Sequence, residues 1–191
     1  MRRPLLLLLL IALAQLAVPA WMVWRHERVR LHGHEHRFRT GPIDPRDPLR
    51  GEYVVLDFEA ATGHFELPPE WAEGTLYAAL GTDSAGFATI ERLSTETPDG
   101  DHLAVRVEPW TVNSEDRTAS RVTLPFDRYY VEEGSGPQAE ALLRPDRMDD
   151  GSVEPRPAHA VVRVLDGRAV LVDLVIDGRP LTDWLNDPTP R

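Results

Sequence analysis

Residues 5–24 form an uncharged run of 20 residues, and this run constrains the fold of the chain more than any other feature. At 1.5 Å per residue, a helix of that length spans roughly 30 Å, which is the thickness of the hydrocarbon core of a bilayer. Trp21 and Trp24 lie at its C-terminal end, where indole rings favour the headgroup region. The run therefore predicts a transmembrane helix, and residues 1–30 are expected to be a membrane anchor with a juxtamembrane segment.

A cleaved signal peptide is the alternative for the same residues. Arg2 and Arg3 would form its basic start and residues 5–17 its apolar stretch, with small residues at 18–20 for cleavage before Trp21. The apolar run continues past that cleavage site and ends in two tryptophans, which favours the uncleaved anchor. Whether residues 1–20 are removed stays open.

The positive charges around the run give opposing indications of its orientation. Two arginines precede the run, and five follow it within about 20 residues (Arg25, Arg28, Arg30, Arg37 and Arg39), which by count favours a C-terminal side facing the cytoplasm. The very short N-terminal tail points the other way, and large domains are translocated largely regardless of charge. We therefore expect the N-terminus to lie inside and the acidic C-terminal domain to lie outside, on the extracytoplasmic side of the membrane.

The composition excludes several classes of chemistry. All 21 basic residues are Arg, and the chain has 31 acidic residues and no Cys. Residues 1–30 carry five Arg and one acid (+4), so the remaining 16 Arg and 30 acids sum to −14. A domain this acidic repels phosphates, so no nucleic-acid partner is expected. Without Lys there is no Schiff base, and without Cys there is no thiol nucleophile, thiolate metal site or disulfide.

Residues 31–191 show the period-two alternation of half-buried β-strands. Three rows of apolar residues each share one face of an expected strand: Val54, Leu56 and Phe58; Leu103, Val105 and Val107; and Val122, Leu124 and Phe126. Residues 76–80 and 87–92 are shorter candidates. The fold class is therefore mainly β, with α+β as a possible variant, and we expect one extracytoplasmic domain built on antiparallel sheet.

The C-terminal part contains the clearest local signal. Residues 160–165 and 168–176 are rich in Val, Leu and Ile and are joined by Asp166-Gly167. Asp-Gly favours a type I′ turn because both turn residues need positive φ, so a β-hairpin is predicted. Helix signals are sparse and restricted to residues 139–143 and 182–186.

The most distinctive segment is residues 42–58, which contains three prolines and alternating charges. Asp44 and Asp47 alternate with Arg46 and Arg50, so the structural interpretation is an ion-paired lead-in to a strand. The functional interpretation is a ligand or partner site. Its candidate residues, with two from a later block, are Asp44, Arg46, Asp47, Arg50, Gly51, Glu52, Tyr53, Tyr130 and Glu133.

Residues 51–58 read Gly-Glu-Tyr-Val-Val-Leu-Asp-Phe, and this stretch resembles the Gly-Asp-Tyr-x-x-Leu-x-Tyr signature of the GDYXXLXY family of bacterial membrane-anchored proteins. Glu52 and Phe58 replace the Asp and the final Tyr of the signature with residues of similar character. Residues 126–136 resemble a second block of the family, and the Val-rich hairpin with residues 176–178 is similar to its close. The resemblance implies an uncharacterised extracytoplasmic domain, often encoded beside multi-span membrane proteins, and it implies no catalytic residue.

His32, His34 and His36 alternate close to the expected anchor. In an extended chain they would project to one side, and imidazole suits zinc, copper or nickel. The alternative is that these residues only form the edge of a first strand. No metal site is predicted, and the three histidines are kept as secondary candidates.

Two functions are compatible with these sequence features. The first is a membrane-anchored accessory or interaction module that acts with a multi-span membrane protein. The alternative is a cell-envelope hydrolase or small-ligand binder that uses Asp44, Asp47, Glu52 and Tyr53. No Gly-x-Ser-x-Gly motif is present, which favours a protein that is not an enzyme; no catalytic residue and no cofactor are predicted.

Overall fold

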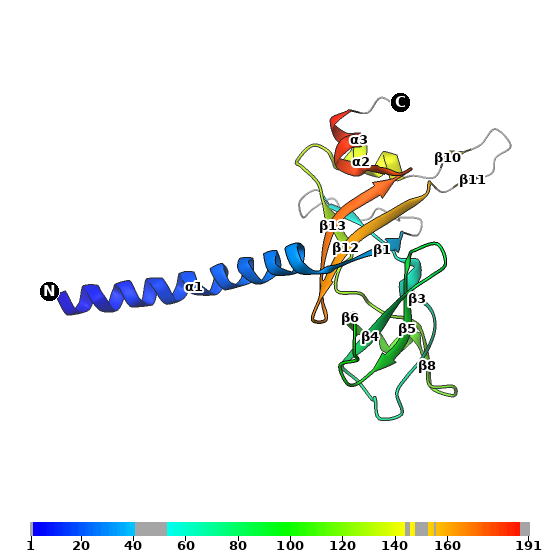
Figure 1. The fold of residues 1–191 in the computed structure, drawn as a ribbon, viewed down its shortest axis with the longest axis horizontal. Coiled ribbons are helices and arrows are strands. Elements are labelled where there is room, and N and C mark those ends of the chain that lie inside the picture. The colour runs from blue at the N-terminus through cyan, green and yellow to red at the C-terminus, as the bar shows by residue number, and fades with distance from the viewer. Residues whose placement is uncertain (1, 41–52, 144–145, 148–152, 155, 188–191) are drawn as a thin grey trace.

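A computed structural model describes residues 2–40, 53–143, 146–147, 153–154 and 156–187 of the chain. A long N-terminal helix, α1 (Arg2–His32), projects from a β-rich body that contains the rest of the described chain (Figure 1). The mainly β fold and its antiparallel pairing confirm the corresponding parts of the predicted fold class.

The elements after α1 are short, and most of them are strands. The strands are β1 (His34–Arg39), β2 (Tyr53–Val55), β3 (Thr62–Glu66), β4 (Thr75–Thr82), β5 (Ala88–Ser94), β6 (His102–Arg106), β7 (Val112–Asn113), β8 (Thr118–Arg121), β9 (Arg128–Tyr130), β10 (Asp146–Arg147), β11 (Val153–Glu154), β12 (Ala158–Leu165), β13 (Arg168–Ile176) and β14 (Arg179–Pro180). The helices are α2 (Gly136–Leu143) and α3 (Leu181–Asn186), with 3₁₀ turns η1 (Glu59–Ala61) and η2 (Pro109–Thr111).

The described strands form several small antiparallel sheets. The largest has the order β1-β12-β13-β14, and two three-stranded sheets have the orders β5-β4-β6 and β3-β8-β7. Strands β2 and β9 form a separate two-stranded ribbon, as do β10 and β11. Strand β1 pairs with β12 along its whole length, so the segment that follows α1 lies beside the C-terminal hairpin.

One hydrophobic core joins these sheets, and three phenylalanines meet within it. Phe38, Phe58 and Phe126 are each almost fully buried, and their ring centroids lie 5.2–5.9 Å apart in edge-to-face arrangements. Such aromatic pairs stabilise a core beyond the burial of their area. The rings come from three distant parts of the sequence and hold them together.

The three rows of apolar residues that were predicted to share a buried strand face, at residues 54–58, 103–107 and 122–126, are buried. Leu103 and Val105 lie on β6, and the predicted strands at 76–80 and 87–92 correspond to β4 and β5. The third row, residues 122–126, has the predicted buried face but is not a continuous strand, because only Thr123 forms a β-bridge. Pro125 has no N–H group to donate to a ladder, which explains the difference.

The C-terminal hairpin is confirmed as strands β12 and β13. Asp166 and Gly167 have φ values of 50° and 75°, as a type I′ turn requires. Asp177 and Gly178 repeat this geometry at the other end of β13, with φ values of 52° and 76°. The two predicted helical segments are also helical, in α2 and α3.

The prediction of a membrane-spanning helix over residues 5–24 requires a correction. Within the described part of the chain, no helix is both long enough and apolar enough to cross a membrane.

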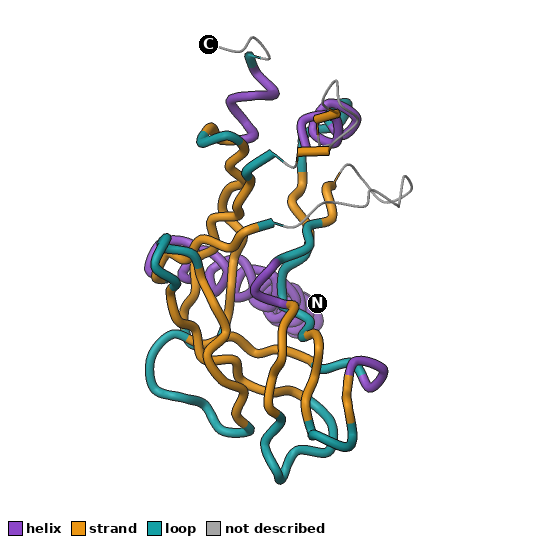
Figure 2. The backbone as a smooth tube through the Cα atoms, turned by 90° about the vertical axis from the view of Figure 1, so that its right-hand side faces the viewer, coloured by secondary structure: helices purple, strands orange, loops and turns teal. Residues whose placement is uncertain are grey.

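The last turns of α1 pack against the outer face of β12 and β13. Val29 is 4% exposed and Val170 is 7% exposed, and neither belongs to the main core cluster. The N–H of Gly33 donates to the Val29 carbonyl at 2.8 Å, which closes the helix where β1 begins. Figure 2 views the helix nearly along its axis, where it meets the β-rich part. The C-terminal end of α1 is therefore fixed to the domain.

Candidate functional site

The β2–β9 ribbon brings two of the predicted site residues together. Tyr53 lies directly opposite Tyr130 in the ladder, and their ring centroids are 5.8 Å apart. Tyr130 is 68% exposed, and the guanidinium of Arg128 lies 5.1 Å from the centroid of the Tyr53 ring. The outward face of the ribbon therefore presents an aromatic pair with a stacked cation; these three side chains are here called the tyrosine patch.

The other predicted site residues lie apart from this pair or outside the description. Glu133 is exposed in the turn after β9, where Gly134 has a φ of 91° and the chain enters α2. The predicted residues outside the described part of the chain are Asp44, Arg46, Asp47, Arg50, Gly51 and Glu52. Tyr53 is thus the one described member of the four residues assigned to the hydrolase or ligand-binder alternative.

The inward face of the ribbon carries a polar contact that the sequence analysis missed. The hydroxyl of Tyr129 hydrogen-bonds to the carboxylate of Asp173 on β13. Burial raises the pKa of Tyr129, and the charge of Asp173 adds to this effect. Burial also raises the pKa of Asp173, although the Leu174 N–H donates to its Oδ1 at 2.8 Å. The sequence feature that could have indicated this contact is Asp173, a single acidic residue inside the apolar run of β13.

His159 lies next to this pair on β12. Burial lowers the pKa of His159, and the positive charge of Arg37 lowers it further. The His159 ring also packs edge-to-face on Phe87, with centroids 5.6 Å apart.

The contact between Tyr129 and Asp173 holds the β2–β9 ribbon against the C-terminal sheet. Its role is therefore to position the segment that carries the motif.

The alternating histidines of β1 share one acidic partner. His34 Nδ1 lies 2.9 Å from Asp101 Oδ1, and His36 Nε2 lies 2.9 Å from Asp101 Oδ2. Burial disfavours the charge of Asp101, but the hydrogen bonds from His36 and His34 outweigh it and lower the pKa of this carboxyl group. His32 ends α1.

These histidines were the secondary candidates for a metal site. Among the described residues, no group of three or more His, Asp or Glu side chains could hold a metal ion. His34 and His36 direct a ring nitrogen at the same carboxylate, and this arrangement joins β1 to the segment that leads into β6.

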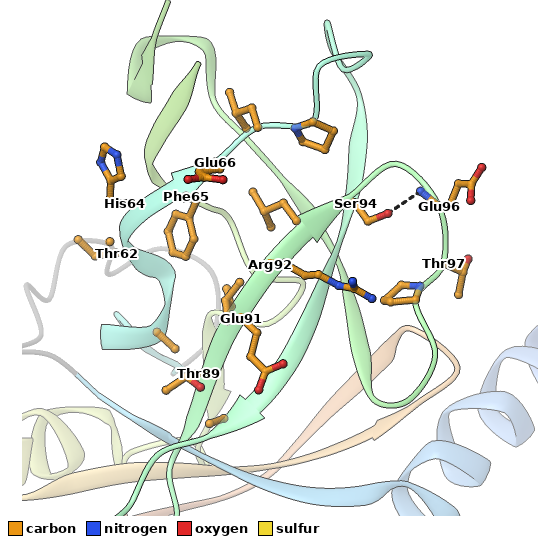
Figure 3. Close-up of a pocket in the computed structure, with 18 of the residues that line it drawn as sticks. Thr62, His64, Phe65, Glu66, Thr89, Glu91, Arg92, Ser94, Glu96 and Thr97 are labelled. Atoms are coloured by element: carbon orange, nitrogen blue, oxygen red, sulfur yellow. Dashed lines mark hydrogen bonds between the residues drawn. The ribbon is translucent and has the colours of Figure 1, made fainter. Parts of the chain in front are cut away.

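A groove of about 1150 Å³ lies between β3 and β5 (Figure 3). Glu66, Glu91 and Glu96 come from different segments and lie in separate parts of it. Glu70 accepts a hydrogen bond from the Thr95 hydroxyl at 2.7 Å, and this contact lowers its pKa. Glycoside hydrolysis needs two facing carboxyl groups, one of them with a raised pKa, so these carboxylates do not favour that chemistry.

The fold and the tyrosine patch define a class of protein: a mainly β domain led by a long helix, with its most distinctive motif on a two-stranded ribbon. The model of the GDYXXLXY protein family matches residues 15–174 of the chain. The chain therefore belongs to the GDYXXLXY protein family, as the motif predicted. No curated protein matches the chain. No solved structure matches it either.

The signature positions of the family have different structural roles in this chain. Leu56 and Phe58 are both 3% exposed and belong to the hydrophobic core. Tyr53 instead lies on the outward face of the ribbon, where it forms the tyrosine patch. Leu56 and Phe58 thus stabilise the fold, whereas Tyr53 contributes to the surface.

Proposed function

We propose that this protein is an extracytoplasmic accessory module held at the bacterial cytoplasmic membrane, where it acts with a multi-span membrane protein. The observation that carries the proposal is the apolar surface of α1. Its large apolar side chains are between 52% and 69% exposed along residues 11–24: Ile11, Leu13, Leu16, Val18, Trp21, Met22, Val23 and Trp24. A continuous apolar surface of this kind marks a site of interaction with a protein or a membrane.

The distribution of these side chains favours an apolar environment around the helix. Leu16, Val18 and Trp21 point in different directions around α1, so its apolar surface is not a single stripe. A helix that is apolar on all sides is usually buried in a protein or a membrane. A multi-span membrane protein that binds α1 would cover this apolar surface.

The base of α1 supports this assignment because it fixes the helix to the domain. Val29 is buried against the outer face of the C-terminal hairpin, and Gly33 continues the chain directly into β1. A partner that holds α1 therefore also holds the β-rich domain close to it. The tyrosine patch supplies a second contact surface, because Tyr and Arg are enriched where proteins bind one another.

The test is site-specific photocrosslinking of the full-length protein in native membranes, followed by mass spectrometry. A photoreactive residue at Leu16 or Val23 is expected to give an adduct with one multi-span membrane protein. Val172 is the matched control, because it is also apolar and exposed but lies on β13. Adducts from Val172 alone, or from soluble proteins alone, would contradict the proposal.

The proposed location has a separate test. A reporter fused after Arg191 is expected to be active on the extracytoplasmic side. Activity in the cytoplasm would overturn the location, whereas the crosslinking result would still decide the partner.

A further inference from the structure

A cavity of about 300 Å³ lies where the base of α1 meets the turn between β12 and β13. Its lining combines indole rings, guanidinium groups and aliphatic side chains: Trp21, Trp24, Arg25, Arg28 and Val29 from α1, and Leu165, Asp166 and Arg168 from the hairpin. Three Arg and one Asp give it a net charge of +2. Residues 31–191 sum to −14, so this cavity is a positive site on an acidic protein.

Two of the three guanidinium groups are free to bind an anion. Among the described residues, no ion pair joins Arg25 or Arg168 to an acid, and the Arg25 guanidinium lies 4.6 Å from the centroid of the Trp21 ring. Arg28 Nη2 is 3.9 Å from Asp166 Oδ2, and both side chains are more than half exposed, so this pair is weak. Arg is the residue that binds phosphate through two parallel N–H donors.

The remaining walls of the cavity are apolar and continue into the exposed surface of α1. Trp21 and Trp24 line the cavity and are themselves among the exposed apolar residues of the helix. Indole rings favour the headgroup region of a bilayer, and Arg attracts anionic lipid there. A ligand that satisfies both parts of the site has an anionic phosphate ester and an apolar tail.

From these observations we infer that the cavity binds the headgroup of an anionic phospholipid. The phosphate ester contacts Arg25 and Arg168, and the acyl chains lie along the apolar side chains of α1 next to Trp21 and Trp24. The inference rests on the proposed function, because it requires the base of α1 to lie at a membrane surface. It adds to that function a preference for one class of lipid.

Asp166 provides a variant that should strengthen binding. Its carboxylate lines the cavity and opposes an anionic ligand, and its φ of 50° is one that Asn adopts readily. Asp166→Asn therefore removes the charge and keeps the turn. Asp177→Asn is the matched control, because Asp177 has a φ of 52°, also precedes a Gly, and lies at the other end of β13.

The experiment is co-sedimentation of the full-length protein with vesicles of phosphatidylcholine alone or with about one third phosphatidylglycerol. The measured quantity is the ratio of the two affinities. We expect a preference for the anionic vesicles that Arg168→Gln lowers by about five-fold, the effect expected for one Arg near an anionic surface. Asp166→Asn should raise the preference, whereas Asp177→Asn and Arg106→Gln, which changes an exposed Arg of β6, should not change it.

The outcomes separate the lipid site from the proposed function. Equal affinity for both vesicles, or the same response to Asp166→Asn and Asp177→Asn, would overturn the lipid site and leave the membrane association intact. Binding to neither vesicle would remove the membrane association on which both rest. Soluble glycerol phosphate distinguishes the source of the phosphate: Arg168-dependent binding of this ester as tight as binding to vesicles would overturn the assignment to a lipid.

Discussion

Gly33 connects α1 to β1, and its replacement by Ala tests whether the helix is rigidly attached. A Cβ atom at this position would lie 2.6 Å from the backbone oxygen of Val29 and 3.0 Å from the backbone N and O of Val164. These are backbone atoms, so they cannot rotate away from the added methyl group. Val29 O accepts the Gly33 N–H, and Val164 pairs with His34 in the β1–β12 ladder, so both residues are held in place. Gly33 itself is held by Arg163 Nη1, which donates to Gly33 O at 3.1 Å.

The expected cost of Gly33→Ala follows from these contacts. Overpacking of a tightly packed site costs about 1–3 kcal/mol, and one backbone clash with two further tight backbone contacts favours the upper part of this range. Replacing Gly with Ala also lowers the entropy of the unfolded chain, which offsets about 0.4–1 kcal/mol of this loss of stability. We therefore expect a net loss of about 1–2.5 kcal/mol in the free energy of unfolding.

The assay is urea denaturation of the full-length protein, with limited trypsin digestion as a second measurement. Strain at Gly33 should separate the last turn of α1 from β12, so cleavage after Arg28 and Arg30 should become faster. Gly63→Ala is the matched control, because a Cβ at Gly63 would meet only the Phe65 ring at an ordinary 3.4 Å. Equal stability and equal cleavage of the two variants would refute the close attachment of α1 to the sheet.

Three further predictions concern the core and the two polar contacts. Phe58→Ala should lower the free energy of unfolding by about 3–5 kcal/mol in urea denaturation, because the ring is 3% exposed; a loss below about 1 kcal/mol would contradict its place in the core. Tyr129→Phe should cost about 1–2 kcal/mol in the same assay, because it removes the hydrogen bond to Asp173, and an unchanged midpoint would argue against that bond. The pKa of Asp101 is lowered in the folded state from 3.8, so its contribution is present above pH 3.8 and is lost as the pH falls through the lowered value. Asp101→Asn should therefore be less stable than the wild type at pH 7 and lose this deficit in more acidic solution, and a deficit that is independent of pH would contradict the link to the imidazoles of β1.

The sequence predicted the parts of the fold that depend on neighbouring residues. The β12–β13 hairpin follows from alternating apolar residues and from Asp166-Gly167, which both act locally. The pairing of β1 with β12 joins residues more than 100 positions apart, and no local pattern specifies it. The division of the strands into several small sheets depends on such distant pairings as well.

The sequence likewise predicted only part of the candidate site. The motif at residues 51–58 identified Tyr53 and the later block at residues 126–136 identified Tyr130, and the structure pairs these two residues directly. The contact between Tyr129 and Asp173 was missed, because it depends on which face of β13 the acid occupies. The apolar run in α1 was recognised, but its length in the sequence suggested a membrane span that the described helix does not support.

A β-bulge explains how β13 contacts both α1 and the β2–β9 ribbon. The register shifts between Val161 and Val162, so that Val170 pairs with Arg163 and Asp173 pairs with Val161. Residues directly opposite one another share a face of the sheet, so Val170 and Asp173 lie on the same face although they are three positions apart. In a regular strand, an odd separation would put them on opposite faces. The bulge thus lets one strand meet α1 on the face of Val170 and the β2–β9 ribbon through Asp173, so a single element positions both the exposed helix and the family motif.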